Sequence, residues 1–255
     1  MKNNFKLLLS LYTLLVVGLS PFALADSVHQ STNIGDDGKW EKSRIRRGFT
    51  IYVRDREAAK SDILPIKVEG IINAPIASIM ENLRTVEGSE DWTPDLLKKT
   101  TLKDLGPREA ITYSLTDMSW PVYDRTLILH NKLHLDKERK LLFVLSKTVP
   151  HKKAPQPERT IEAFVGYSNM GFRPVSRNKT YVELTAFIDP RGSIPSWLIN
   201  FYQTSWPVDF LEAVEKRANE HNNPLRPGLQ TMLDELLSLM KWDAETYTPL
   251  ASARP

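Results

Sequence analysis

The chain has 255 residues, no cysteine, and a formal net charge of +3 that includes Lys2 and Lys6. Without cysteine it can form neither disulfides nor zinc–thiolate sites, and it has no thiol nucleophile. Removing those two lysines leaves +1, and the remainder holds no long Lys/Arg block, so nothing in the composition argues for a nucleic-acid partner.

The first 25 residues have the layout of a cleaved export signal. A short basic stretch ending at Lys6 precedes the apolar run 7–19, and Ala23-Leu24-Ala25 presents the small residues that signal peptidase reads. A transmembrane anchor is the alternative, but it needs about 20 apolar residues and this run is shorter. We expect cleavage after Ala25, a flexible leader over 26–39 and a periplasmic location. A lipoprotein is excluded because there is no cysteine to carry the lipid.

The chain beyond the leader begins with strand patterns and then turns helical. Residues 49–54 and 64–72 alternate apolar and polar side chains, which predicts two β-strands. Pro75 then suits the start of a helix predicted over 76–86, where apolar residues recur at helical spacing. Residues 91–94 (DWTP) follow as a compact turn.

A long strand-rich region follows. We expect strands at 97–105, 110–118, 124–135, 141–149, 160–167, 171–175 and 180–189. The first four have short connections, which require antiparallel neighbours because a parallel crossover needs a dozen or more residues. No helix is predicted between 97 and 189, which excludes a doubly wound α/β fold.

The C-terminal part is helical. An apolar-faced helix is predicted over 194–220, and Pro207 within it predicts a kink or a break near Trp206. A last amphipathic helix is predicted over 229–242. The predicted fold class is therefore α+β, with a curved antiparallel sheet covered by a long C-terminal helix. A cavity remains wherever that helix does not fill the curve, and such pockets suit apolar ligands.

Four segments resemble, in order, the START (StAR-related lipid transfer) family. The most specific is 189–200 (DPRGSIPSWLIN), which is similar to the family's junction between the last strand and the C-terminal helix. The turn 91–94, the segment 120–125 (WPVYDR) and pieces of 160–174 resemble other family elements. The residues of these motifs to which we assign structural roles are Trp92, Arg125, Asp189, Pro190, Gly192 and Pro195.

The resemblance implies a helix-grip fold over about 40–222, with 223–255 as an extra helix and tail. It implies a tunnel that holds one apolar ligand (sterol-like, fatty-acyl or another lipid) and a carrier that makes transient membrane contact. We expect no cofactor, no catalysis and a monomer. Two positions depart from the family pattern. Thr126 stands where the family has Asp, and Arg191 stands where Gly is common.

The resemblance and the strand periodicity suggest a set of cavity residues. They are Ser114, Leu127, Leu129, Asn131, Phe187, Trp197, Phe201 and Trp206. Ser114 and Asn131 match the family's polar cavity positions. They could hydrogen-bond a neutral ligand, so we expect a neutral lipid rather than an anionic one. The alternative is that backbone or water satisfies both. A gate is expected at Trp120, Pro121, Val122 and Pro207.

Two other functions stay open. Helix-grip relatives include polyketide cyclases and aromatases, for which His134, Asp117 or Tyr113 would be the acid–base candidates. The third possibility is an interaction module whose own side chains fill the cavity. The sequence contains no H-E-x-x-H, P-loop, G-x-S-x-G or G-x-G-x-x-G motif, so we expect no metal and no nucleophilic triad.

Overall fold

The computed structural model describes residues 40–54, 62–118, 122–221 and 224–247, apart from the side chain of Phe201. The predictions for the export signal, for the leader and for Trp120 and Pro121 lie outside these residues.

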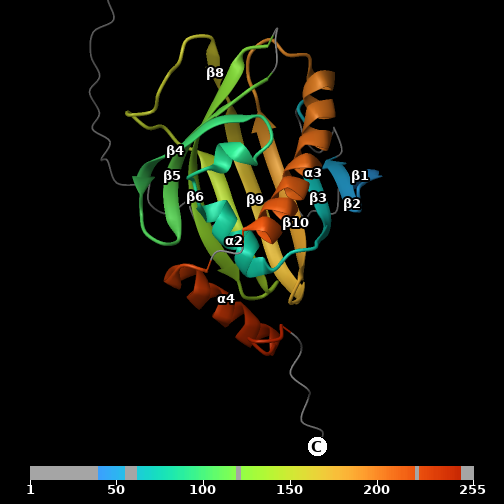
Figure 1. The fold of residues 1–255 in the computed structure, drawn as a ribbon. Coiled ribbons are helices and arrows are strands. Elements are labelled where there is room, and N and C mark those ends of the chain that lie inside the picture. Colours follow the sequence, from blue (N-terminus) through green and yellow to red (C-terminus); the bar gives the residue numbers. More distant parts are fainter. Residues whose placement is uncertain (1–39, 55–61, 119–121, 222–223, 248–255) are drawn as a thin grey trace, which may run out of the picture. The chain divides into compact units, whose positions relative to one another are not determined.

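The described residues form one sheet and its covering helices (Figure 1). The strands are β1 (Trp40–Arg46), β2 (Phe49–Arg54), β3 (Ile66–Ile72), β4 (Leu96–Asp104), β5 (Glu109–Thr116), β6 (Asp124–Asp136), β7 (Leu141–Thr148), β8 (Thr160–Glu162), β9 (Phe164–Ser176) and β10 (Lys179–Asp189). The helices are α2 (Ile76–Arg84), the short 3-10 helix η2 (Ser89–Asp91), α3 (Ser196–Glu220) and α4 (Pro227–Met240).

The sheet is antiparallel along its whole path. The strand order is β1-β2-β3-β10-β9-β7-β6-β5-β4, and α3 lies across one face of it (Figure 1). Only β8 stands off this path. It pairs with the start of β6 in parallel, an arrangement that the sequence did not predict. The predicted α+β class is confirmed, with the long C-terminal helix packed against the antiparallel sheet.

Three elements differ from the sequence-based prediction. Strand β1 was not predicted. The strands expected at 160–167 and 171–175 are instead the short β8 and the continuous β9. The polar Ser168 and Asn169 stay in β9 because both pair with β10 on one side and β7 on the other, which satisfies their backbone groups.

The third difference is α3, which runs unbroken through Pro207. This proline has no N–H to donate to the carbonyl of Gln203, so the helix forgoes one internal hydrogen bond there. Packing maintains the helix across this position, because Val208 and Leu211 are completely buried.

The core lies where α2, α3 and α4 meet the sheet. Helix α4 covers one end of the sheet close to α2 (Figure 1) and buries five apolar residues, Leu229, Met232, Leu233, Leu236 and Leu237. Each such burial contributes about 1.5–3 kcal/mol. The residue that precedes α4, Arg226, also pairs with the buried Glu81 of α2 at 2.5 Å. Helix α4 is therefore an integral part of this domain.

Candidate ligand-binding site

An apolar cavity of about 230 Å³ lies between α3 and the sheet. Strands β3, β6 and β10 contribute Ile66, Leu127, Ala186 and Ile188 to its walls. Helix α3 contributes Leu198, Ile199, Tyr202, Gln203, Trp206 and Pro207. Leu198, Tyr202 and Trp206 are spaced four residues apart, so one face of the helix supplies this wall.

The long polar side chains in this wall are directed to the protein, whereas the buried Trp206 indole N–H has no hydrogen-bond partner among the described residues. Arg125, Tyr202 and Gln203 are the long ones. Gln203 Nε2 donates to the carbonyl oxygen of Ile188 at 2.5 Å, and the Tyr202 hydroxyl donates to Asp95 Oδ2 at 2.5 Å. A ligand in the cavity therefore meets mainly carbon.

Arg125 fastens the junction between β10 and α3 to strand β6. Its Nε donates to the carbonyl of Pro190 at 2.6 Å, Nη2 donates to that of Arg191 at 2.9 Å, and Nη1 donates to that of Tyr123. Burial lowers the pKa of Arg125, yet the guanidinium keeps its charge because arginine is not deprotonated in proteins. These contacts give Arg125 a structural role in addition to its place in the wall.

The junction between β10 and α3 requires glycine at position 192. Its φ of +75° belongs to the left-handed region that favours glycine. A Cβ at this position would lie 2.8 Å from Ile161 Cδ1 and 3.3 Å from Arg125 Nη2. Asp189 Oδ1 accepts the Arg191 N–H at 2.7 Å, and Pro195 precedes α3 with a φ of −59°. The turn can therefore pass close to Arg125 before the helix begins.

The larger cavity is lined by several of the residues that the sequence predicted for the cavity or for the gate. They are Leu127 and Trp206 from the cavity set and Val122 and Pro207 from the gate set. Ser114 and Leu129 belong to the lining of neither cavity described here. Asn131 lines a second, smaller cavity.

Phe187 and Trp197 lie elsewhere, contrary to the prediction. Neighbouring Ala186 and Ile188 line the cavity, so strand alternation turns Phe187 to the opposite face, where its ring lies 6.5 Å from that of Tyr167. Trp197 is 72% exposed in the first turn of α3. The side chain of Phe201 lies outside the described residues.

The sequence prediction missed Tyr202, Gln203, Ala186 and Ile188. Two signals could have identified most of them. Tyr202 stands four residues before Trp206 on the predicted helix. Ala186 and Ile188 share one strand face and would have replaced Phe187 if the alternation had been counted from the buried Val182 and Leu184.

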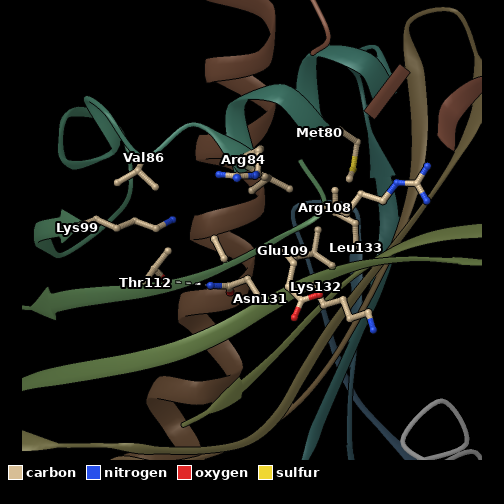
Figure 2. A pocket seen from close by; sticks show the side chains of 13 residues that line it. Met80, Arg84, Val86, Lys99, Arg108, Glu109, Thr112, Asn131, Lys132 and Leu133 are labelled. Carbon is tan, nitrogen blue, oxygen red and sulfur yellow. Dashed lines mark hydrogen bonds between the residues drawn. The ribbon is translucent and has the colours of Figure 1, made fainter. Parts of the chain in front are cut away.

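The smaller cavity has a volume of about 60 Å³ and lies between α2 and strands β4 to β6. Figure 2 shows Asn131 in this space, with its amide directed at Thr112. Asn131 Nδ2 donates to Thr112 Oγ1 at 2.9 Å, and Ser146 Oγ donates to Asn131 Oδ1 at 2.7 Å. The Asn131 amide is thus already engaged by the protein.

The two cavities face the same side of β6. Leu127 lines the larger cavity and Asn131 the smaller one. These two residues are four apart on β6, so their backbones lie about 13 Å apart at the usual 3.3 Å per residue. An aromatic stack begins at the larger cavity. The Trp206 ring lies 5.2 Å from that of Phe210, which lies 6.1 Å from that of Trp92.

The acid–base candidates of the sequence lie away from both cavities. His134, Asp117 and Tyr113 line neither of these cavities, and burial raises the pKa of Tyr113. Within the described ranges, no three His, Asp or Glu side chains gather closely enough to hold a metal ion. Of the helices in this part of the chain, none combines the length and the apolar character needed to cross a membrane.

Residues 25–223 match the model of the START domain family, and the chain belongs to that family. It is 24% identical over 181 residues to the uncharacterized protein PA1579 of Pseudomonas aeruginosa, covering 71% of this chain and 87% of that protein. The fold is similar to that of human STARD10, with a TM-score of 0.66, 16% identity, and coverage of 78% of this chain and 79% of that one. It is also similar to a fragment of a STAR-related lipid transfer protein from Xanthomonas axonopodis. That TM-score is 0.61 at 22% identity, covering 71% of this chain and 99% of the fragment.

Proposed function

We propose that this protein binds one hydrophobic ligand, a lipid, in the larger cavity and carries it between membranes. The observation that carries the proposal is the cavity itself. It encloses about 230 Å³ beneath α3, and its long polar side chains bond to the protein rather than point into the space. Membership of the START family supports it, as does the likeness to a protein named for STAR-related lipid transfer.

The hydrophobic effect supplies the binding energy in this proposal. Burial contributes about 0.8 kcal/mol per methylene, so ten buried methylenes gain about 8 kcal/mol before the costs of ordering the ligand. A binding site of this kind needs no catalytic group. The volume left between α3 and the sheet also favours ligand binding over an interaction module filled by its own side chains.

Entry of the ligand requires α3 to move relative to the sheet. Val122 and Pro207 lie in the cavity wall, and Pro207 removes one hydrogen bond from α3 beside it. The bonds of Tyr202 to Asp95 and of Gln203 to Ile188 hold the helix closed. We include in the proposal that these bonds break when the ligand enters.

Export to the periplasm is a separate part of the proposal, supported by the layout of residues 1–25 alone. Its test is the mass and the N-terminal sequence of the protein recovered from a periplasmic fraction. We expect the chain to begin at Asp26. Recovery of the uncleaved chain from the membrane fraction would instead favour an anchor.

Ligand binding is tested with a neutral apolar fluorophore and two Leu-to-Trp variants. Leu127→Trp fills the larger cavity, whereas Leu97→Trp adds the same bulk at a position that is 52% exposed. We expect the first variant to lose fluorophore binding and the second to retain it. Equal binding by both would contradict the proposal. Mass spectrometry of solvent extracts from the native protein would then identify the ligand.

A further inference from the structure

The smaller cavity gathers positive charge. Its lining includes the basic side chains Arg84, Lys99, Arg108 and Lys132 and one acidic side chain, Glu109. In Figure 2 the Lys99 ammonium and the Arg84 guanidinium point into the same space as the Asn131 amide, whereas Arg108 and Lys132 extend away from it. Two cations therefore face this space from separate elements, β4 and α2.

The Lys99 ammonium has no bonded partner among the described residues. Glu90 accepts a hydrogen bond from the backbone N–H of Lys99 at 2.8 Å, not from its side chain. Burial lowers the pKa of Lys99, the Glu90 carboxylate opposes this shift in part, and Arg84 lowers the pKa again by a smaller amount. Keeping a cation in such a place costs free energy unless a partner compensates it.

Arg84 also retains hydrogen-bonding capacity. Its Nη2 lies 3.2 Å from the carbonyl oxygen of Gly106 and 3.4 Å from Oδ1 of the largely exposed Asp104. Its Nε is buried and has no acceptor among the residues that the structure describes. A buried donor of this kind is uncommon in folded proteins and calls for an acceptor.

The acid in the lining does not neutralise these cations. Glu109 Oε1 lies 2.6 Å from His130 Nε2 and is engaged with that side chain. Thr112 adds a neutral group, because its hydroxyl oxygen accepts from Asn131 and its hydrogen stays free to donate. The groups that face the space are thus suited to a negatively charged acceptor.

The register of the sheet connects this cation to the larger cavity. Lys99 of β4 pairs with Ser114 of β5, and Ser114 pairs with Leu127 of β6. Directly paired residues share one face of the sheet, so the three side chains form a row across it. Adjacent strands lie about 4.8 Å apart, which places Lys99 about 10 Å from a residue in the wall of the larger cavity.

From this arrangement we infer that the smaller cavity binds a compact anionic group, a carboxylate or a phosphate, between Lys99 and Arg84. The group is the head of the same ligand whose apolar chain lies in the larger cavity, so the inference rests on the proposed function. A volume of about 60 Å³ admits a group of a few atoms. Charge-assisted hydrogen bonds to both cations would hold it. The sequence-based expectation of a neutral ligand depended on Ser114 and Asn131 and left out Lys99 and Arg84.

The test compares three amphiphiles with one chain length and different head groups. Hexadecanoate, hexadecyl phosphate and hexadecanol each displace the neutral fluorophore from the larger cavity of the full chain. We expect at least one of the two anions to bind tenfold or more tightly than the alcohol. Lys99→Met should abolish that preference, and Arg84→Gln should reduce it. Lys98→Met is the matched control, because Lys98 is an exposed neighbour on β4 and should have no effect.

The outcomes separate the inference from the function on which it rests. Equal affinity for all three amphiphiles, or an equal loss in Lys98→Met and Lys99→Met, overturns the inference while displacement still supports lipid binding. Failure of every amphiphile to displace the fluorophore, or of the fluorophore to bind, overturns the proposed function. Inorganic phosphate or acetate alone is the last arm. If either binds in a Lys99-dependent manner and the amphiphiles show no preference, the site holds a free anion and the head-group assignment is wrong.

Discussion

The hydroxyl of Tyr202 donates to Asp95 Oδ2 at 2.5 Å, which joins α3 to the residue that precedes β4. Tyr202 also lines the larger cavity, so this bond holds the helix over that cavity. Burial raises the pKa of Tyr202, and the hydrogen bond to Asp95 raises it further, so the phenol keeps its proton well above neutral pH.

Tyr202→Phe should therefore accelerate ligand exchange. A hydrogen bond to a charged group contributes about 1.5–3 kcal/mol, which corresponds to a rate increase of about tenfold or more if the bond breaks on opening. Stopped-flow dissociation of the fluorophore measures this rate. Tyr52→Phe on β2 removes a hydroxyl outside the cavity lining and should leave the rate unchanged. Equal rates in the wild type and Tyr202→Phe would show that this bond does not limit opening.

Arg125→Met should destabilise the protein by about 3 kcal/mol or more. The substitution removes the three hydrogen bonds that the buried guanidinium donates to the carbonyl groups of Tyr123, Pro190 and Arg191. Urea denaturation followed by circular dichroism gives the free energy of unfolding. Arg177→Met, at an exposed position, is the control and should change it little. A loss no larger than that of the control would mean that the junction is held by other contacts.

Gly192→Ala separates backbone strain from crowding when it is compared with Gly48→Ala. Both glycines have positive φ, at +75° and +83°, but only the Cβ at 192 would crowd Ile161 and Arg125, whereas the Cβ at 48 has open space. We expect a loss of about 1 kcal/mol at position 48 from strain alone and a clearly larger loss at 192. Thermal unfolding of the two variants measures the difference, and equal losses would assign the whole cost to the backbone.

The sequence predicted more of this fold than of its polar site. The strand alternation and the junction 189–200 were sufficient for the sheet, the long helix and the wall positions of Leu127 and Trp206. Phe187, predicted for the cavity, lies on the opposite face because strand alternation turns Ala186 and Ile188 toward the cavity. Trp197 points to solvent because the first turn of α3 turns Leu198 and Ile199 toward the cavity, which helical spacing alone does not show.

Lys99 and Arg84 could not be identified as a pair from the sequence. Lys99 follows Leu97 and Lys98 in a segment whose side chains resemble a solvated strand, and a bulge between 96 and 98 changes which of them faces inward. Arg84 ends α2, a common place for a solvated cation. Their approach depends on how the C-terminal end of α2 lies relative to β4, where Arg84 reaches Asp104, and local periodicity does not describe this.

Helix α4 should prove essential to the stability of this domain. Leu233→Ala removes a completely buried side chain from the core that α4 shares with α2 and the sheet. We expect a loss of 2–5 kcal/mol, the usual range for such a cavity. Leu239→Ala, at a partly exposed position of the same helix, should cost much less. Chemical denaturation compares the two, and similar small losses would mean that α4 is only loosely attached.

Lys99→Met should stabilise the unliganded protein while it removes the preference for anions. The cation is held close to Arg84, with Arg108 and Lys132 also in the lining. The nearby acids among the described residues are Glu90, Glu109 and Asp104, which pairs with Arg84. Because burial lowers the pKa of Lys99 below its ordinary value of about 10.4, the unfolded chain binds more protons than the folded one between those two pKa values. Stability therefore rises with pH across that window. Replacement by Met should raise the free energy of unfolding below the window and remove this rise.

The five tyrosines whose pKa values are raised, Tyr113, Tyr167, Tyr181, Tyr202 and Tyr247, act in the opposite direction above about pH 10 in both proteins. The difference between the two denaturation curves, measured from pH 6 to pH 10, isolates the contribution of Lys99. A difference that does not change with pH would mean that Lys99 titrates alike in the folded and unfolded chains.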